Sequence, residues 1–174
     1  MASSEKIVLK KLNIKKDITR KYQKWINDYE VMRYTEQKFQ KHTLLDIKNF
    51  VKKQNKSKIS FLYGIFLKNK NSNLHIGNIK LGPIFVHHKT AEISYFIGEK
   101  KIWGRGYATY AIKKIIKIAK KKGIKKLRAG FYKMNVASKK ALIKNNFKIE
   151  GEFKSEIIYE GKRASRCWFG KVLR

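Results

Sequence analysis

The chain has 174 residues, 43% of them apolar and 13% aromatic, and its 43 Lys and Arg against 12 Asp and Glu give a net charge of +31. This length and apolar content suit one folded domain, residues 1–174, and exclude a disordered basic arm. The longest apolar stretch, residues 61–67, is far shorter than the ~20 residues of a membrane helix, and the first residues lack the apolar core of a signal peptide. We therefore expect a cytoplasmic protein with no membrane partner.

Metal and redox chemistry have little support in the sequence. The single cysteine, Cys167, cannot form an internal disulfide. The four histidines lack the spacing of a zinc site, and the neighbours His87 and His88 point to opposite faces of an extended chain. We therefore expect no metal.

The positive charge attracts polyanions, so nucleic acid is one possible partner. The lysines are spread along the whole chain among many Ile and Asn residues, a mixture that an AT-rich coding sequence also produces. No basic-region helix and no aromatic RNA-binding signature accompanies them. A non-catalytic basic module that binds RNA or a ribosome therefore remains an alternative, supported by charge alone.

Hydrophobic periodicity predicts a strand over residues 6–12 and then two helices. From Asp17, apolar and aromatic side chains recur at spacings of three and four, the pattern of a helix with one buried face. They are Ile18, Tyr22, Trp25, Ile26 and Tyr29. Thr43 and Asp46 resemble a capping box and predict the start of the second helix.

Three extended runs follow, over residues 61–67, 74–86 and 91–98. Turn-forming residues at 68–73 and 87–90 separate them, so the runs predict an antiparallel meander. Pro83 cannot donate a hydrogen bond to a sheet ladder, and we expect it at a bend or bulge of the middle strand.

The next segment predicts the longest helix. From Ala108 to Ala119 apolar residues occupy one helical face and lysines the other, and Gly123 follows where a left-handed residue is favoured. The order of elements predicts a mixed α/β fold with a parallel strand pair across this helix. The remaining predicted elements are a strand over 124–132, a short helix over 136–144, and closing strands over 147–153 and 165–173.

A Gly-x-Gly turn joins the third strand of the meander to the long helix. Gly104 and Gly106 carry no side chain to obstruct a ligand, and the first N–H groups of the helix have no partner within it, so they can bind an anion. Arg105 or Lys101 can add a charged contact. The turn lacks the third glycine of dinucleotide sites and the Gly-Lys-Ser/Thr ending of P-loops, so it predicts a phosphate cradle of another kind.

The segment Lys101-Ile102-Trp103-Gly104-Arg105-Gly106 resembles the acetyl-CoA pyrophosphate loop of the GNAT superfamily of N-acetyltransferases, whose pattern is Arg/Gln-x-x-Gly-x-Gly/Ala. Lys101 stands where Arg or Gln is usual. Three other segments are similar to the ribosomal-protein and amino-sugar branch: Thr90-Ala91-Glu92-Ile93-Ser94-Tyr95, Asn135-Val136-Ala137-Ser138 and Asn145-Asn146-Phe147-Lys148-Ile149-Glu150-Gly151. Asn146 replaces a glycine at a position where Asn can adopt the left-handed conformation. The likeness extends over almost the entire chain.

This resemblance implies a mostly antiparallel central sheet with flanking helices and a V-shaped splay between the fourth and fifth strands. It also implies acetyl-CoA as co-substrate and direct attack of a primary amine on the thioester within a ternary complex. In relatives the fourth strand, here residues 93–97, pairs with pantetheine, and a backbone N–H polarises the thioester carbonyl. The residues expected to bind acetyl-CoA are Tyr95, Phe96, Ile97, Lys101, Trp103, Gly104, Arg105, Gly106, Tyr107, Ala108, Thr109, Asn135 and Ser138.

The resemblance also suggests two catalytic residues. Glu92 matches a carboxylate of relatives that can take the ammonium proton, directly or through water; the alternative is an ion pair with one of the many basic residues. Many family members protonate the thiolate with a tyrosine on the helix after the fifth strand, but Leu142 occupies that position here. Ser138 is the expected substitute that hydrogen-bonds the CoA sulfur. Asn135 and Ser138 are, alternatively, ordinary residues of a helix start.

The acceptor side is less well defined. Trp25, Asp28 and Tyr34 lie in the first helical region, which borders the acceptor site in this fold, and Glu156 lies in the closing hairpin. Core packing is the alternative for Trp25. We expect a small-molecule or peptide amine, either a nucleotide-linked amino sugar or a protein N-terminus, because a chain of charge +31 repels polyamines. A homodimer is left open.

Overall fold

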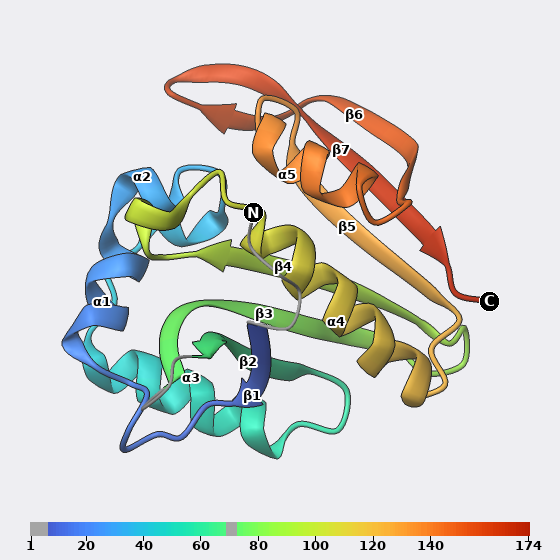
Figure 1. The fold of residues 1–174 in the computed structure, drawn as a ribbon. Coiled ribbons are helices and arrows are strands. Elements are labelled where there is room, and N and C mark those ends of the chain that lie inside the picture. The colour runs from blue at the N-terminus through green and yellow to red at the C-terminus, as the bar shows by residue number, and fades with distance from the viewer. Residues whose placement is uncertain (1–6, 69–72) are drawn as a thin grey trace.

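The computed structural model describes residues 7–68 and 73–174. Residue 6 of the first predicted strand and most of the turn predicted at 68–73 lie outside the described residues. In chain order the elements are β1 (Ile7–Lys11), α1 (Arg20–Asn27), α2 (Tyr29–Met32), η2 (Glu36–Phe39), α3 (Leu44–Lys56), β2 (Phe61–Lys68), β3 (Asn73–Phe85), β4 (Thr90–Ile97), η3 (Lys100–Ile102), α4 (Tyr107–Lys121), β5 (Lys126–Tyr132), α5 (Val136–Ile143), β6 (Lys148–Tyr159) and β7 (Lys162–Val172) (Figure 1).

The described residues form a seven-stranded sheet in the order β1-β2-β3-β4-β5-β7-β6. Neighbouring strands are antiparallel except β4 and β5, which are parallel and pair from Thr90–Lys126 to Glu92–Arg128. Because β4 runs on to Ile97 and β5 to Tyr132, the two strands separate beyond Glu92, as Figure 1 shows. The parallel pair and the V-shaped splay are therefore confirmed.

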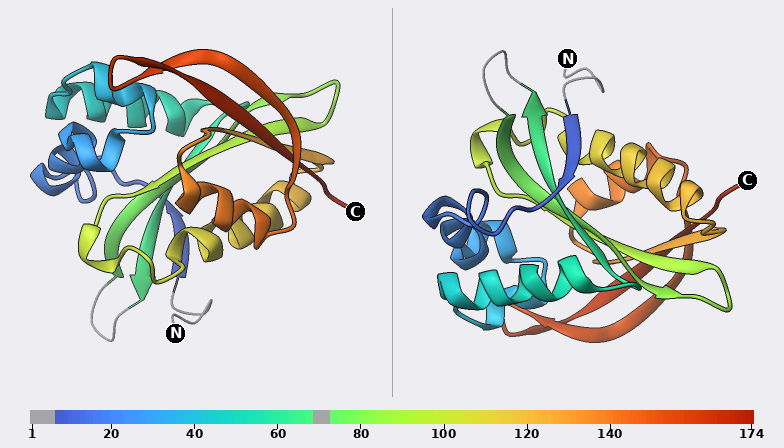
Figure 2. Two further views of the ribbon diagram at one scale, coloured as in Figure 1. Left: turned by 90° about the horizontal axis from the view of Figure 1, so that it is seen from above. Right: turned by 90° about the horizontal axis from the view of Figure 1, so that it is seen from below.

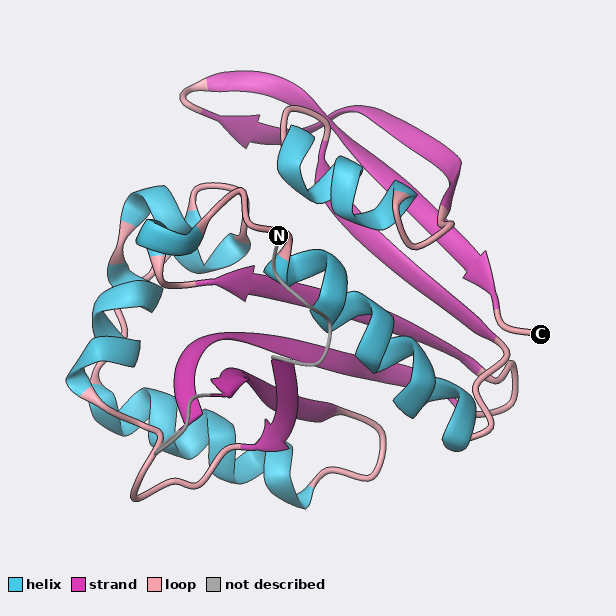
Figure 3. Cartoon of the chain, viewed as in Figure 1, coloured by secondary structure: helices cyan, strands magenta, loops and turns pink. Residues whose placement is uncertain are grey.

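Helices cover both faces of the sheet. Helices α4 and α5 lie on one face and α3 lies on the other, which the two views of Figure 2 and the colouring of Figure 3 make clear. The buried face of α4, with Ala111, Ile112 and Ile115, packs against the central strands. On the opposite face Tyr22 of α1 and Val51 of α3 pack in a second core. Burial of apolar side chains on both faces is the main stabilising contribution to such a layered fold.

The predicted long helix is confirmed, and its start is unusual. Gly106 precedes the first residue, Tyr107, in the left-handed conformation with φ +82°, and Gly104 has φ +76°. L-residues with a side chain rarely adopt this backbone region, which explains both glycines. No side chain among the described residues caps the helix, so its first N–H groups remain free.

Several local predictions are also confirmed. Thr43 and Asp46 form a reciprocal capping box at the start of α3. The register of β3 and β4 shifts between Leu81 and Ile84, around Pro83, as expected for a residue that cannot donate to the ladder. Asn146 has φ +60°, in the left-handed region.

The first helix and the closing strands differ from the prediction. The predicted helix from Asp17 begins at Arg20, capped by Thr19, and stops at Asn27. The side chain of Asp28 accepts the N–H groups of the next residues and starts α2, so Tyr29 leaves the buried stripe and is 54% exposed. The closing strands β6 and β7 are longer than predicted. Most of β6 is exposed and only Ile157 of this strand is buried, so its burial shows no alternation from which the strand could be predicted.

Two further findings concern the described residues alone. None of their helices is both long and apolar enough to span a bilayer. They contain no group of three or more His, Cys, Asp or Glu side chains arranged to hold a metal ion.

Candidate active site

Two cavities meet where β4 and β5 separate. The first, of about 640 Å³, lies between β4, the residues after it and the starts of α4 and α5. The second, of about 560 Å³, lies between strands β3 to β5 and the segment from α1 to α3. The residues that line both are Tyr34, Thr35, Tyr95, Phe96, Asn135 and Ser138. Two molecules bound in the two cavities would therefore meet at these side chains.

The wall of the first cavity is built from the Gly-x-Gly turn. Gly104, Gly106 and the first residues of α4, Tyr107 to Thr109, line it. An added Cβ at Gly104 would meet no atom within 4 Å, so the positive φ, and not crowding, requires glycine. The free N–H groups at the positive end of a 15-residue helix form a site for an anion.

Eleven of the thirteen residues expected to bind the cofactor line the first cavity. The other two, Lys101 and Arg105, are exposed beside it and line neither cavity. Lys140 of α5 and Lys144, the C-cap of this helix, line it instead. Sequence reasoning missed these two cations because the helix is rich in lysine throughout and nothing marks which ones face inward.

Ser138 is fixed at the junction of the cavities by two hydrogen bonds. Its backbone N–H donates to Oδ1 of Asn135, the N-cap of α5, at 3.0 Å. Its Oγ lies 2.7 Å from the hydroxyl of Tyr95 on β4. Burial raises the pKa of Tyr95 to about 12, so this hydroxyl stays protonated near neutral pH. Leu142, at the position where relatives carry a tyrosine, is fully buried in the core.

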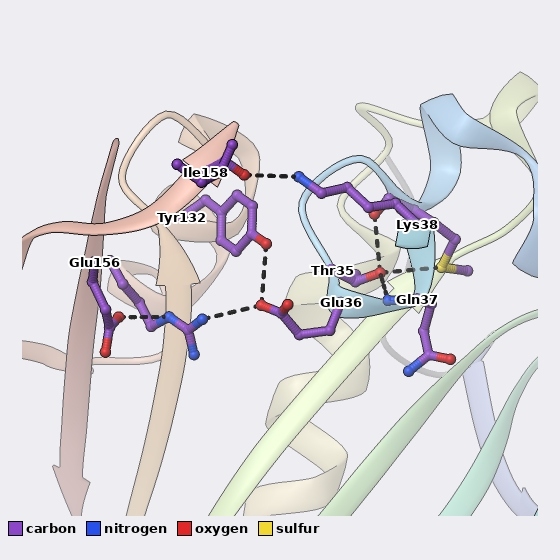
Figure 4. Close-up of polar contacts among 9 residues, drawn as sticks. Thr35, Glu36, Gln37, Lys38, Tyr132, Glu156 and Ile158 are labelled. Atoms are coloured by element: carbon purple, nitrogen blue, oxygen red, sulfur yellow. Dashed lines mark hydrogen bonds and ion pairs between the residues drawn. The ribbon is translucent and has the colours of Figure 1, made fainter. Parts of the chain in front are cut away.

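A chain of charged groups crosses the mouth of the second cavity (Figure 4). Oε1 of Glu36 accepts hydrogen bonds from the Tyr132 hydroxyl at 3.1 Å and from the Arg166 guanidinium at 3.0 Å. Arg166 Nε also lies 2.9 Å from a carboxylate oxygen of Glu156. Burial, and after it the Glu36 carboxylate, raises the pKa of Tyr132 to about 12. One guanidinium between two carboxylates leaves this group with a net negative charge.

Aromatic rings form the outer wall of the same mouth. Tyr34 stacks on Tyr159 with ring centroids 5.4 Å apart, and Tyr132 lies edge-on 6.3 Å from each. The Lys38 ammonium is 4.8 Å from the Tyr132 ring and 5.0 Å from the Tyr159 ring, and it donates to the Ile158 carbonyl at 3.4 Å. These contacts join the segment before α3 to the β6–β7 hairpin across the cavity (Figure 4).

Glu92 and Trp25 do not line either cavity. The Glu92 carboxylate forms an ion pair with Arg128, 2.6 Å away on the neighbouring strand. Trp25 is 7% exposed and belongs to the second core, which is the core-packing alternative. Asp28, outside both cavities as well, pairs with Lys100, and this hydrogen bond lowers the pKa of the Asp28 carboxyl.

Sequence reasoning missed the charged group around Glu36. This residue begins a single 3-10 turn, where no periodicity signals a role. Tyr132 had a usable signal, since it ends the strand that forms one side of the splay, three residues before Asn135. Of the predicted acceptor residues, Tyr34 lines both cavities, and Glu156 takes part through Arg166.

Residues 6–148 match the family model described as the acetyltransferase (GNAT) domain. The match spans most of the chain, so the protein belongs to the GNAT family, whose members use acetyl-CoA as acetyl donor, and it is an acetyltransferase. No curated protein matches the chain.

Solved structures share the fold across nearly the whole length. The microcin self-immunity acetyltransferase MccE, in complex with acetyl-CoA and AMP, has a TM-score of 0.80 and 21% identity, over 97% of this chain and 93% of that one. A spermidine N-acetyltransferase from Vibrio cholerae, with CoA and spermine, has a TM-score of 0.84 and 17% identity, over 97% and 96%. RimL, a ribosomal-protein α-N-acetyltransferase in complex with coenzyme A, has a TM-score of 0.83 and 14% identity, over 97% and 94%. At these identities the likeness extends to the fold alone.

Proposed function

We propose that the chain transfers the acetyl group of acetyl-CoA to a primary amine by direct attack within a ternary complex. The observation that carries this proposal is that two cavities, one ending in free helix N–H groups, meet at Ser138. An amine and a thioester bound in separate cavities with a shared junction need no covalent enzyme intermediate. Holding both reactants in place supplies much of the rate enhancement of such a reaction.

The first cavity suits the acetyl donor. The free N–H groups after Gly106 bind the pyrophosphate, and Lys140 and Lys144 of the same cavity wall add positive charge. Beyond Glu92 the edge of β4 is not paired with β5, so its backbone is available to the pantetheine arm and to the thioester carbonyl. Ser138 hydrogen-bonds the sulfur as negative charge develops on it.

The second cavity suits the amine. Glu36 and Glu156 place two carboxylates at this mouth that can bind an ammonium directly, although Arg166 and Lys38 supply two positive charges there and the chain as a whole is strongly basic. Among the similar structures one acetylates spermidine and another a ribosomal-protein N-terminus. We propose a small-molecule or peptide amine for this chain, with a nucleotide-linked amino sugar and a protein N-terminus as the first acceptors to assay. Glu92 remains the proposed proton acceptor, although its ion pair with Arg128 must open or relay through water.

Two experiments test this function. Acetyl-CoA should raise the midpoint of thermal unfolding by mass action, whereas a short nucleic-acid duplex in about 0.2 M salt should not. A screen for thiol release with amino sugars, peptides and diamines should then identify the acceptor. Stabilisation by the duplex alone would favour the second candidate, a basic RNA- or ribosome-binding module, for which the charge of +31 is the supporting observation.

A further inference from the structure

Tyr95 and Ser138 come from different sides of the splay and meet at the junction of the two cavities. Tyr95 lies on β4, beyond the last residue that pairs with β5, and Ser138 lies in the first turn of α5. Their hydroxyl oxygens are 2.7 Å apart, the usual distance of a hydrogen bond between two hydroxyls, and both residues line both cavities. The Tyr95 hydroxyl is also 3.4 Å from the Ser138 carbonyl oxygen.

A hydroxyl can donate one hydrogen bond and accept two, so the direction of this contact decides what Ser138 offers to a ligand. If Tyr95 donates to Ser138 Oγ, the single hydrogen of Ser138 is free to point elsewhere. A thiolate in the junction accepts hydrogen bonds and donates none, so it draws the Ser138 hydrogen toward itself. Tyr95 then supplies the hydrogen that Ser138 Oγ accepts, and the two bonds strengthen one another.

We infer that Tyr95 is a positioning residue, which donates its hydrogen bond to Ser138 Oγ and thereby directs the Ser138 hydroxyl onto the departing sulfur of coenzyme A. This inference rests on the proposed function. The proton of Tyr95 stays on its own oxygen throughout, because a group whose pKa is raised to about 12 does not yield its proton to a thiolate. The tyrosine thus acts through Ser138, not as the proton donor that relatives place on the helix.

The bound coenzyme A thiol itself provides the test. A hydrogen bond that stabilises the thiolate lowers the pKa of the bound thiol, which can be followed by the ultraviolet absorbance of the thiolate during a pH titration of the complex. We expect Ser138→Ala to raise the pKa of the bound thiol by about 1 to 2 relative to wild type, the worth of one hydrogen bond to a charged group. Tyr95→Phe should raise it by a smaller amount, because it weakens that bond without removing it. The double variant should raise the thiol pKa no further than Ser138→Ala alone, because Tyr95 acts on the sulfur only through the Ser138 hydroxyl.

Tyr63→Phe is the matched control. Tyr63 is a half-buried tyrosine of β2 whose pKa burial also raises, but it lines neither cavity, so its removal should leave the titration unchanged. If Ser138→Ala raises the thiol pKa and Tyr95→Phe does not, or if neither does, the inference is overturned while coenzyme A binding still stands. Failure of the wild-type chain to bind coenzyme A would instead overturn the proposed function.

Discussion

The ammonium of Lys100 lies 2.8 Å from a carboxylate oxygen of Asp28. Lys100 belongs to η3, in the segment between β4 and α4, whereas Asp28 starts α2, so this pair joins the two sides of the junction. The same ammonium lies 2.8 Å from Glu30, and Lys21 pairs with Glu99 at 2.8 Å. The segment that presents the helix N–H groups is therefore tied to the helices beside the second cavity.

Removal of the Lys100 ion pairs with Asp28 and Glu30 should weaken acetyl-CoA binding slightly. The groups are exposed and salt screens their attraction, so we expect Lys100→Ala to raise the Kd by about two- to fivefold at low salt and less at high salt. Calorimetry at two ionic strengths measures this. Lys101→Ala is the comparison, because that exposed neighbour lines neither cavity; a larger loss there would show that Lys101 contacts the ligand directly, as the family pattern suggests.

A carboxylate at Gly104, beside the free N–H groups of α4, should strongly weaken acetyl-CoA binding. We expect Gly104→Glu to raise the Kd for acetyl-CoA at least about 100-fold, or about 2.7 kcal/mol, because it puts negative charge beside the phosphates. Gly161→Glu is a matched control: Gly161 has φ +75° against +76° at Gly104, and both have open space around an added Cβ, but Gly161 lies in the hairpin turn. Equal affinity of the two variants would mean that the cradle lies elsewhere.

The charged group at the second cavity should control the acceptor. We expect Glu36→Gln to raise the KM for the amine about tenfold, with the KM for acetyl-CoA unchanged, because it removes the charge that Arg166 and Tyr132 hold at the mouth. Glu92→Gln should lower kcat without changing the KM for acetyl-CoA, because it removes the proposed proton acceptor. A loss of stability alone would identify Glu92 as the ion-pair partner of Arg128.

The contact of Trp25 with Gly98 should matter for stability. A Cβ at Gly98 would overlap the indole of Trp25, so we expect Gly98→Ala to destabilise the fold by about 1 to 3 kcal/mol. Gly151→Ala, where an added Cβ meets nothing within 4 Å, should be close to neutral in the same denaturant titration. A small effect at Gly98 would mean that the Trp25 ring is not held in place by packing and can move aside.

Acid should weaken the ion pairs Lys100–Asp28 and Lys21–Glu99. Hydrogen bonds from Lys100 and Lys21 hold the pKa values of Asp28 and Glu99 below their ordinary values of 3.8 and 4.5. Depressed carboxyl pKa values stabilise the folded state above the unfolded values, and this contribution is lost as the pH falls through the folded ones. The thermal midpoint should therefore drop below about pH 4.5, and less steeply in Glu99→Gln. An identical slope in that variant would contradict the assignment.

The fold was predictable where apolar residues recur with the regular period of a helix or a strand. The face of α4 from Ala111 to Ala119 and the meander before it have clear periods, and the Gly-x-Gly turn is tied to a backbone conformation that other residues resist. The break at Asp28 was not predictable, because the capping bonds that start α2 compete with an apolar stripe that would otherwise continue. The edge strand β6 is exposed except around Ile157, so its sequence shows no periodic burial pattern.

The site was predictable on the side built from one continuous segment. Residues 95–97 and most of residues 102–109 line the first cavity because strand, turn and helix follow one another directly. The second cavity gathers Glu36, Tyr132 and Arg166 from three distant elements, whose proximity depends on the sheet order and on the long β6–β7 hairpin. Side chains that meet only through tertiary packing leave no spacing in a single sequence.

The divergence of β4 from β5 has a thermodynamic consequence. Peptide groups along residues 93–96 lack a neighbouring strand on that edge, whereas the Ile97 carbonyl accepts a hydrogen bond from Trp103 Nε1 at 2.8 Å. Water must satisfy the groups that face this edge until another chain-like molecule does. A pantetheine arm lying there would act as a guest strand and close the gap in the middle of the sheet. Donor occupancy would then protect the interior from local opening, and amide hydrogen exchange in β4 should slow when the nucleotide is added.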